Sequence, residues 1–399
     1  MASAPLTASE REAAGKAARA RSPRKGHAVW DPGPDRADPV GILERQDETR
    51  APELVPIRHG RMLVSPFTFY RGAAAVMASD LAATPRSGLE VQLCGDAHLS
   101  NFGAFMAPDR RLIFDINDFD ETHPGPFEWD VKRLAASVAV AGQALGLKRG
   151  RGEAATTAAA TSYRQEMRRL AALGHLDVWY SRVDVETLQR YLSRISARRS
   201  GRLRKSVAKA ERKDRMRALD RLTATDGDRL RIVSDPPLIV PIEEVSTVRE
   251  AKLESAQIES MLRDLIDQYR RTLSSDVNEL ARRYDYVHAA HKVVGVGSVG
   301  AQAWIVLTLG RDRGDPLFLQ VKQAQRSVLE PYTRPSRFRN QGRRVVEGQR
   351  LMQAASDVFL GWLTAEGLDG RQRDYYVRQL WDGKGSAEIE TMDAEGLRL

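Results

Sequence analysis

One short segment of the sequence is dense in side chains that bind metal ions or move protons. A loop contains Asp96, His98 and Asn101, and the carboxylate-rich stretch that follows it contains Asp115, Asp118 and Asp120. Phosphoryl transfer requires a carboxylate that orients or deprotonates the attacking hydroxyl, and an amide oxygen and a second carboxylate that hold Mg²⁺ on the phosphates. Any one of these residues alone more often only stabilises a turn. Their combination predicts this chemistry, with Asp96 and His98 as catalytic residues and Asn101 and Asp118 as metal ligands.

The same segment resembles a motif of known enzymes. The string GDAHLSN at residues 95–101, followed by an apolar strand and an Asp-Phe pair, is similar to the catalytic motif of aminoglycoside and choline phosphotransferases, which are relatives of protein kinases. The resemblance implies that Asp96 is the catalytic-loop Asp, Asn101 the metal-binding Asn, and Asp118, which precedes Phe119, the metal-binding Asp. Asp115 stays open as the alternative metal ligand.

The resemblance continues beyond this loop. Residues 125–130, GPFEWD, resemble the segment of those enzymes in which an Asp opens a helix and braces the catalytic loop, so Asp130 is expected to be structural. Cys94 stands where those families have His. Because that His is usually a packing residue, a small buried Cys is expected to replace it without acting as a reactive thiol.

A glycine-rich stretch lies about two hundred residues later in the chain. The string VGVGSVG at residues 294–300 has the pattern G-x-G-x-x-G, which is a weak signal alone, and offers Gly295, Gly297, Ser298 and Gly300 to a nucleotide. A dinucleotide-binding fold requires a helix after it, whereas residues 301–309 have the composition of a strand. The pattern therefore favours a glycine-rich hairpin that covers phosphates, as in kinases.

Lys322 ends the apolar strand FLQVK, which resembles the kinase strand whose Lys contacts the α and β phosphates. A surface lysine is the competing interpretation of that residue. In kinases a Glu on a helix pairs with this Lys, and Glu347, within the predicted helix Arg343 to Ala355, is the first candidate. Glu330 is a poorer one because Pro331 follows it.

These residues are expected to lie on a fold with two lobes. Periodicity predicts helices over residues 70–81 and 128–145, a strand over 89–93, a strand pair over 102–105 and 112–116, and a later sheet that includes residues 293–309, 317–321, 358–363 and 375–380. The glycine-rich loop precedes the catalytic loop in ordinary kinases but follows it here. The fold class predicted is α+β: a two-lobed, kinase-like fold that is circularly permuted, which packing tolerates when termini lie at the surface.

Composition divides the chain into five segments. These are a disordered leader (1–44), the part with the catalytic loop (45–147), a basic all-helical region (148–284), a nucleotide-binding sheet (285–385) and a tail (386–399). Residues 148–220 contain 19 Lys and Arg against 8 Asp and Glu, a net charge of +11 that exceeds the +9 of the whole chain. Nucleic acid is therefore a possible partner of this region, although a solvated charged surface is favoured.

The remaining composition is that of a soluble protein, and no oligomeric state follows from it. Hydrophobic residues make up 42% of the chain, and no apolar stretch reaches the roughly 20 residues that span a bilayer. The N-terminus lacks the apolar segment of a secretory signal, and a single cysteine fits a reducing compartment. We therefore expect a cytoplasmic protein without membrane insertion.

A longer resemblance covers residues 39–386. The chain is similar to a bacterial domain-of-unknown-function family through the strings SPFTFYRGAA, CGDAHLSNFG, FDINDFDETHPGPFEWDVKRLAAS and VGVGSVG. Members usually continue into another helical stretch, which leaves open whether the substrate-binding part is complete here. The resemblance implies a kinase-like fold and no substrate.

The function expected is an ATP- and Mg²⁺-dependent phosphotransferase that acts on an unidentified hydroxyl acceptor, either a small molecule or a protein. The alternatives are an ATP-binding pseudokinase, a nucleotidyl transferase and a basic nucleic-acid-binding protein. A metallophosphoesterase is disfavoured because such sites need more histidines than the seven of this chain supply in suitable contexts.

Overall fold

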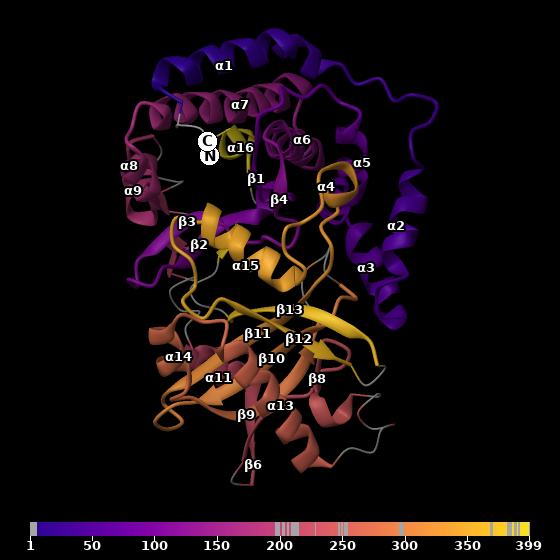
Figure 1. Ribbon diagram of the computed structural model, residues 1–399, viewed down its shortest axis with the longest axis vertical. Coiled ribbons are helices and arrows are strands. Elements are labelled where there is room, and N and C mark those ends of the chain that lie inside the picture. Colours follow the sequence, from indigo (N-terminus) through magenta and orange to yellow (C-terminus); the bar gives the residue numbers. More distant parts are fainter. Residues whose placement is uncertain are drawn as a thin grey trace.

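The computed structural model describes residues 6–195, 200, 201, 204, 205, 207, 208, 215–227, 229–245, 248, 250, 254–293, 295, 299–367, 370–380, 385, 386, 389 and 392–398. It is a mixed α+β structure with a mainly helical part and a part built on a large sheet, and helix α15 lies between them (Figure 1). In the described residues no helix is long and apolar enough to cross a membrane.

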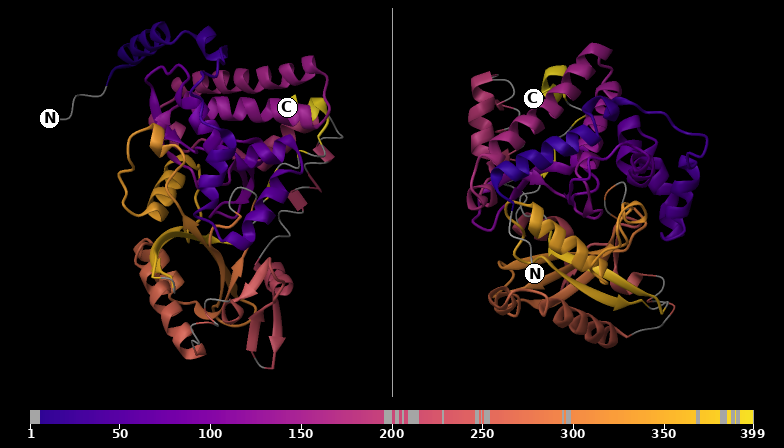
Figure 2. Two further views of the ribbon diagram at one scale, coloured as in Figure 1. Left: turned by 90° about the vertical axis from the view of Figure 1, so that its right-hand side faces the viewer. Right: turned by 45° about the horizontal axis from the view of Figure 1, so that its top comes forward.

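The helical part contains most of the first half of the chain. Its elements are α1 (Ala8–Arg21), η1 (Arg24–Ala28), α2 (Pro39–Asp47), η2 (Pro52–Leu54), α3 (Val55–Met62), α4 (Pro66–Gly72), α5 (Ala74–Ala82), β1 (Glu90–Leu93), η3 (Leu99–Asn101), β2 (Phe102–Met106), β3 (Leu112–Ile116), β4 (His123–Pro126), α6 (Glu128–Ala144), α7 (Arg149–Ala171), α8 (His175–Trp179), β5 (Val183–Asp184) and α9 (Val185–Ile195). Helix α6 packs against α4 and α7, and the last elements of the chain, β14 (Gly385–Ser386) and α16 (Ala394–Arg398), return to this part, as Figure 2 also shows.

The second half of the chain builds the sheet part. Its elements are α11 (Arg215–Leu222), β6 (Thr223–Asp226), β7 (Arg229–Ile232), β8 (Ile239–Pro241), η4 (Ile242–Glu244), α13 (Ser255–Arg270), α14 (Ser275–Ala281), β9 (Asp285–Lys292), β10 (Ala303–Leu309), β11 (Pro316–Ala324), η5 (Glu330–Tyr332), α15 (Gln341–Met352), β12 (Gly361–Glu366) and β13 (Gln372–Gln379). Six of these strands form an antiparallel sheet in the order β12-β13-β11-β10-β9-β8.

The two faces of this sheet have different neighbours because successive strand residues point to opposite sides. On β11, Leu319 packs with Tyr269 of α13 in one buried cluster, whereas Phe318 packs with Leu219 of α11 in another. Lys322 is an even number of residues from Phe318 and therefore lies on the face of α11. The sheet thus carries Lys322 on the opposite side from α13.

Local sequence explains how the elements near the site begin. Ser65 caps α4 in a capping box with Thr68, with Pro66 at the first helical position. Asn340 caps α15 by accepting a hydrogen bond from the Arg343 N–H at 2.7 Å.

Several predicted elements are confirmed and others need correction. The strand pair predicted at 102–105 and 112–116 is present as β2 and β3, which pair antiparallel. The helix predicted over 70–81 is two helices, α4 and α5.

Two of the predicted segments also need correction. The leader predicted as disordered contains α1, whose Thr7 and Glu10 form a capping box, together with η1 and the start of α2. The region 148–284 is not all-helical: it contains β5 to β8, and β8 pairs with β9 of the large sheet.

Candidate active site

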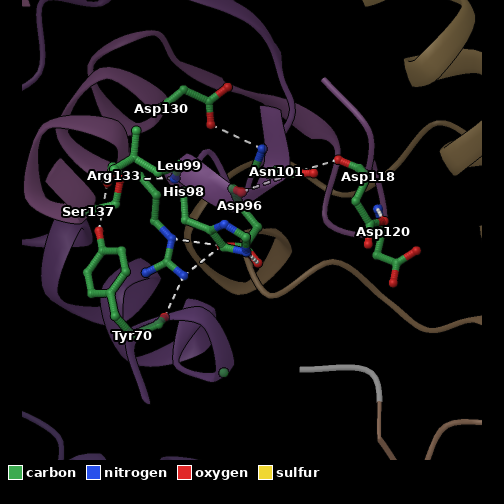
Figure 3. A network of polar contacts seen from close by, with 12 residues as sticks. Tyr70, Asp96, His98, Leu99, Asn101, Asp118, Asp120, Asp130, Arg133 and Ser137 are labelled. Atoms are coloured by element: carbon green, nitrogen blue, oxygen red, sulfur yellow. Dashed lines mark hydrogen bonds and ion pairs between the residues drawn. The ribbon is translucent and has the colours of Figure 1, made fainter. Parts of the chain in front are cut away.

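The catalytic loop is held by the start of helix α6. The Asp130 carboxylate accepts hydrogen bonds from the backbone N–H of Cys94 at 2.8 Å and of Gly95 at 3.0 Å (Figure 3). Gly95 has φ of +84°, and a Cβ there would lie 2.3 Å from the carbonyl oxygen of Glu121, so the loop requires glycine at this point. The brace predicted for Asp130 is confirmed, and burial raises the pKa of Asp130 to about 6.

Asn101 links the catalytic loop to the acidic loop after β3. Its amide nitrogen donates to the carbonyl oxygens of Asp96 at 3.0 Å and Asp118 at 2.9 Å. An amide NH₂ has two hydrogens, so these bonds use both donors and leave the carbonyl oxygen of the side chain as the remaining group. That oxygen is the metal-ligating atom that the sequence predicts for Asn101.

Lys322 reaches the acidic loop although more than two hundred residues separate them. Its ammonium pairs with the Asp120 carboxylate and lies 3.6 Å from Asp118 Oδ2, and its side chain is only 3% exposed. The Tyr376 hydroxyl, from β13, donates to Asp120 Oδ1 at 2.7 Å. Burial lowers the pKa of Lys322, but Asp118 and Asp120 raise it more, so the net shift is upward and the ammonium stays charged.

The counter-ion predicted for Lys322 is wrong. Glu347 lies on α15 but pairs with Arg343 at 3.5 Å, one turn earlier on the same helix. The side chain that joins α15 to the acidic loop is Arg344, which donates to the carbonyl oxygens of Thr122 at 2.6 Å and Asp120 at 2.8 Å. The residue of α15 that contacts the acidic loop is therefore Arg344, three residues before Glu347.

The two alternatives for a metal-binding Asp differ in their surroundings. Asp115 accepts hydrogen bonds from the N–H of Ile116 at 2.7 Å and of Ala354 at 2.9 Å, and burial raises its pKa. It therefore ties β3 to the end of α15. The Asp118 side chain is 42% exposed and lies beside Lys322, so the geometry favours Asp118 as a ligand.

The described residues contain no group of three or more His, Cys, Asp or Glu side chains that could hold a metal ion by themselves. Asn101 and Asp118 supply two oxygen donors, one of them an amide. Protein sites for Mg²⁺ commonly use one or two carboxylates together with substrate phosphates and water. The donor set fits a magnesium ion that is bound together with a nucleotide.

Asp96 pairs with a buried arginine and lies near a histidine. Arg133 donates from Nε at 2.9 Å and from Nη2 at 2.6 Å to Asp96 Oδ1, while His98 Nε2 lies 3.6 Å from Asp96 Oδ2. Burial lowers the pKa of His98, so the imidazole is neutral near pH 7. Figure 3 shows these side chains converging on the loop. The Arg133 side chain is only 2% exposed.

The glycine-rich stretch is described only at its ends. Gly297 and Ser298 lie outside the described residues, while Gly295 and Gly300 have φ values of +72° and +87°. Arg61 donates to the carbonyl oxygen of Gly295 at 2.6 Å, so α3 contacts the start of the loop.

The end of the loop is held by the neighbouring connection. Arg50 donates to the carbonyl oxygen of Val299 at 2.5 Å, and the N–H of Ala51 donates to Gly300 at 2.9 Å. Burial lowers the pKa of Arg50 to about 10, which leaves it charged at neutral pH. Nothing in the sequence indicated that these arginines meet a loop more than two hundred residues away.

Sequence reasoning missed three other site residues for which a signal existed. Arg133 is three residues after Asp130 and therefore shares its helix face. Tyr376 pairs with Lys322 across β13 and β11, which a strand pairing would have shown. Asp120 belongs to the acidic loop but was not chosen.

The comparisons with known proteins identify a family and no activity. No curated protein and no solved structure gives a match. The family described as "Uncharacterized protein conserved in bacteria (DUF2252)" matches residues 50–399, which is most of the chain. The chain therefore belongs to this bacterial family, as the strings from SPFTFYRGAA to VGVGSVG predicted.

Proposed function

We propose that the protein is an ATP- and Mg²⁺-dependent phosphotransferase that acts on a hydroxyl group of a small molecule or a protein. The observation that carries the proposal is the ion pair of Lys322 with Asp118 and Asp120 beside Asn101. A buried lysine, a carboxylate and an amide oxygen in one place are the groups that bind the phosphates of a nucleotide and their metal ion.

The order of elements in the sheet part supports a kinase-like, permuted fold. A hairpin of β9 and β10 carries the glycine-rich stretch, β11 carries Lys322, α15 follows, and β12 and β13 complete the sheet. This is the order that the resemblance to phosphotransferases implies for a nucleotide lobe. The helical part carries the catalytic loop, and α15 lies between the two parts (Figure 1).

Each of these residues has a distinct role in the proposed phosphoryl transfer. Lys322 would bind phosphate oxygens, and Asn101 Oδ1 and Asp118 would hold Mg²⁺, which would supply charge neutralisation on the phosphates. Asp96 orients the acceptor hydroxyl and takes its proton while the acceptor oxygen bonds to the terminal phosphorus and the bond from that phosphorus to the diphosphate oxygen breaks. Asp120 and Tyr376 keep Lys322 in place.

The experiment that tests this assignment is a turnover assay with purified protein, ATP, Mg²⁺ and a pool of metabolites, with slow ATP hydrolysis as a second readout. Asp96→Asn is nearly isosteric and should lower turnover by roughly a hundredfold to ten-thousandfold, the range for loss of a general base, with nucleotide affinity unchanged. Asp109→Asn, on the exposed turn after β2, is the matched control and should behave as wild type.

The same assay separates the alternatives. Wild-type protein that binds ATP but shows no transfer or hydrolysis above the Asp96→Asn background would indicate a pseudokinase. Release of diphosphate with a nucleotide attached to the acceptor would indicate a nucleotidyl transferase. Either result would overturn phosphoryl transfer.

A further inference from the structure

Arg133 makes the closest ionic contact with the proposed base. It projects from α6, and its Nε and Nη2 both donate to the same oxygen, Asp96 Oδ1, at 2.9 and 2.6 Å. Burial disfavours the charged guanidinium, but the pairing with Asp96 outweighs this and raises the pKa of Arg133. The guanidinium therefore stays charged beside Asp96 (Figure 3).

Tyr70 holds Arg133 from the opposite side. Arg133 Nη2 donates to the carbonyl oxygen of Tyr70 at 2.9 Å, the Tyr70 hydroxyl donates to the carbonyl oxygen of Arg133 at 2.8 Å, and the guanidinium carbon lies 4.1 Å from the centre of the Tyr70 ring. Burial raises the pKa of Tyr70 to about 12, so the hydroxyl remains a donor. Helix α4 thus fixes the guanidinium by hydrogen bonds and by ring contact.

The two oxygens of Asp96 therefore have different roles. Oδ1 takes both hydrogen bonds from Arg133, whereas Oδ2 lies 3.6 Å from Nε2 of the neutral His98, which is beyond hydrogen-bond distance. The Asp96 side chain is 22% exposed. A hydroxyl that approaches this carboxylate thus meets Oδ2, because Arg133 covers Oδ1.

We infer that Arg133 is a positioning residue that turns Asp96 so that Oδ2 receives the proton of the acceptor hydroxyl. The inference rests on the proposed phosphotransferase function and extends it to α4, because Tyr70 holds the arginine in place. Proton transfer requires the base within hydrogen-bond reach of the hydroxyl. A displacement of about 1 Å can cost roughly a hundredfold in rate.

The test compares kcat and the KM for ATP in variants of the full chain. Arg133→Met should lower kcat by roughly tenfold to a hundredfold and leave the KM for ATP unchanged, because Lys322 and Asp118 are not touched. Arg133→Lys keeps the charge but loses the planar guanidinium, whose two N–H groups donate to one oxygen of Asp96. The kcat of this variant should therefore lie between those of wild type and Arg133→Met. Arg270→Met, which removes a hydrogen-bonding arginine of α13 on the far face of the sheet, should keep the wild-type kcat.

A structural role alone would not give rescue by a small cation. Guanidinium chloride, added to Arg133→Ala below denaturing concentration, should restore part of kcat because the ion fits the site that the side chain leaves. It should not stimulate Arg270→Ala. If Arg133→Met does not fold, Arg133→Lys carries the test, and a wild-type kcat in that variant overturns the inference.

These assays distinguish a failure of the proposed function from a failure of the positioning role of Arg133. Wild-type protein that neither binds ATP nor turns over refutes the proposed function and the role of Arg133 with it. An active wild type together with an Arg133→Met variant of unchanged kcat refutes only the positioning role.

Discussion

Replacing Asp130 with alanine should loosen the catalytic loop, and the chain contains its own probe for this. The carboxylate accepts two backbone hydrogen bonds, from Cys94 and Gly95. Hydrogen bonds to charged groups contribute about 1.5 to 3 kcal/mol each, so Asp130→Ala should favour local opening of the loop by about 3 kcal/mol. At about 1.4 kcal/mol for each factor of ten, this corresponds to a roughly hundredfold larger open population.

Cys94 reports that opening because it is the sole cysteine and is fully buried. Burial raises the pKa of its thiol, so it should react very slowly with an aromatic disulfide reagent in wild-type protein. In Asp130→Ala the reaction under native conditions should be roughly a hundredfold faster, since labelling follows the population of the open state. The assay is the absorbance of the released thiolate against time.

The matched control is Asp357→Ala. Asp357 also accepts two backbone hydrogen bonds, from Phe359 at 2.9 Å and Gln379 at 2.5 Å, but in the sheet part of the molecule. Its loss should destabilise the protein without selectively exposing Cys94. If Asp130→Ala labels no faster than Asp357→Ala at equal global stability, the brace on the catalytic loop is refuted.

Two further predictions concern the same loop and its neighbour. Gly95→Ala should be more destabilising than Gly146→Ala in urea unfolding. Both positions have positive φ, which costs an alanine about 1 to 2 kcal/mol, but only at Gly95 would the new Cβ lie 2.3 Å from a backbone oxygen, whereas the space at Gly146 is open. Equal losses would contradict the proposed clash. Burial raises the pKa of Glu121 from its usual 4.5 to about 7, so the Glu121 carboxyl binds a proton more tightly in the folded state than in the unfolded state. The resulting stabilisation is complete below pH 4.5 and is lost as the pH rises to about 7. Glu121→Gln should therefore flatten the fall in the free energy of unfolding over that range, and an unchanged pH dependence would show that Glu121 is ionised in the fold.

The local part of the site was predictable from sequence, because its contacts follow from one loop and one helix start. The structure confirms the brace expected of Asp130, which accepts a hydrogen bond from the N–H of Cys94, and Asn101 donates to the carbonyl oxygen of Asp96 within the loop. The resemblance to phosphotransferases implied that Lys322 and Asp118 both serve a bound nucleotide, and in the structure the Lys322 ammonium lies 3.6 Å from Asp118 Oδ2.

The tertiary partners were not predictable in the same way. Which residue of α15 faces the acidic loop depends on how the helix is rotated against the sheet, and the spacing that suggested Glu347 does not distinguish it from Arg344. The sequence favoured Asp118, which precedes Phe119, but left Asp115 open as the metal ligand. The hydrogen bond of Asp115 to Ala354 and the exposed position of Asp118 beside Lys322 separate them in the structure.

Two incorrect predictions concern segments whose sequence contains a recognisable structural signal. The Thr7 and Glu10 pair has the spacing of a capping box, but the composition of the leader outweighed it. Asp226 and Gly227 mark the hairpin of β6 and β7, within a region whose charge and helical periodicity dominated the prediction.

The measurement that tests the central claim most directly is calorimetric titration of the full chain with ATP, with and without Mg²⁺. Binding of ATP should require Mg²⁺ for full affinity, and Lys322→Met and Asp118→Asn should each weaken ATP binding at least tenfold. Glu347→Gln should leave the affinity unchanged, because Lys322 pairs with Asp118 and Asp120 rather than with Glu347. Absence of ATP binding by folded wild-type protein, or equal affinity in wild type, Lys322→Met and Asp118→Asn, would contradict the account.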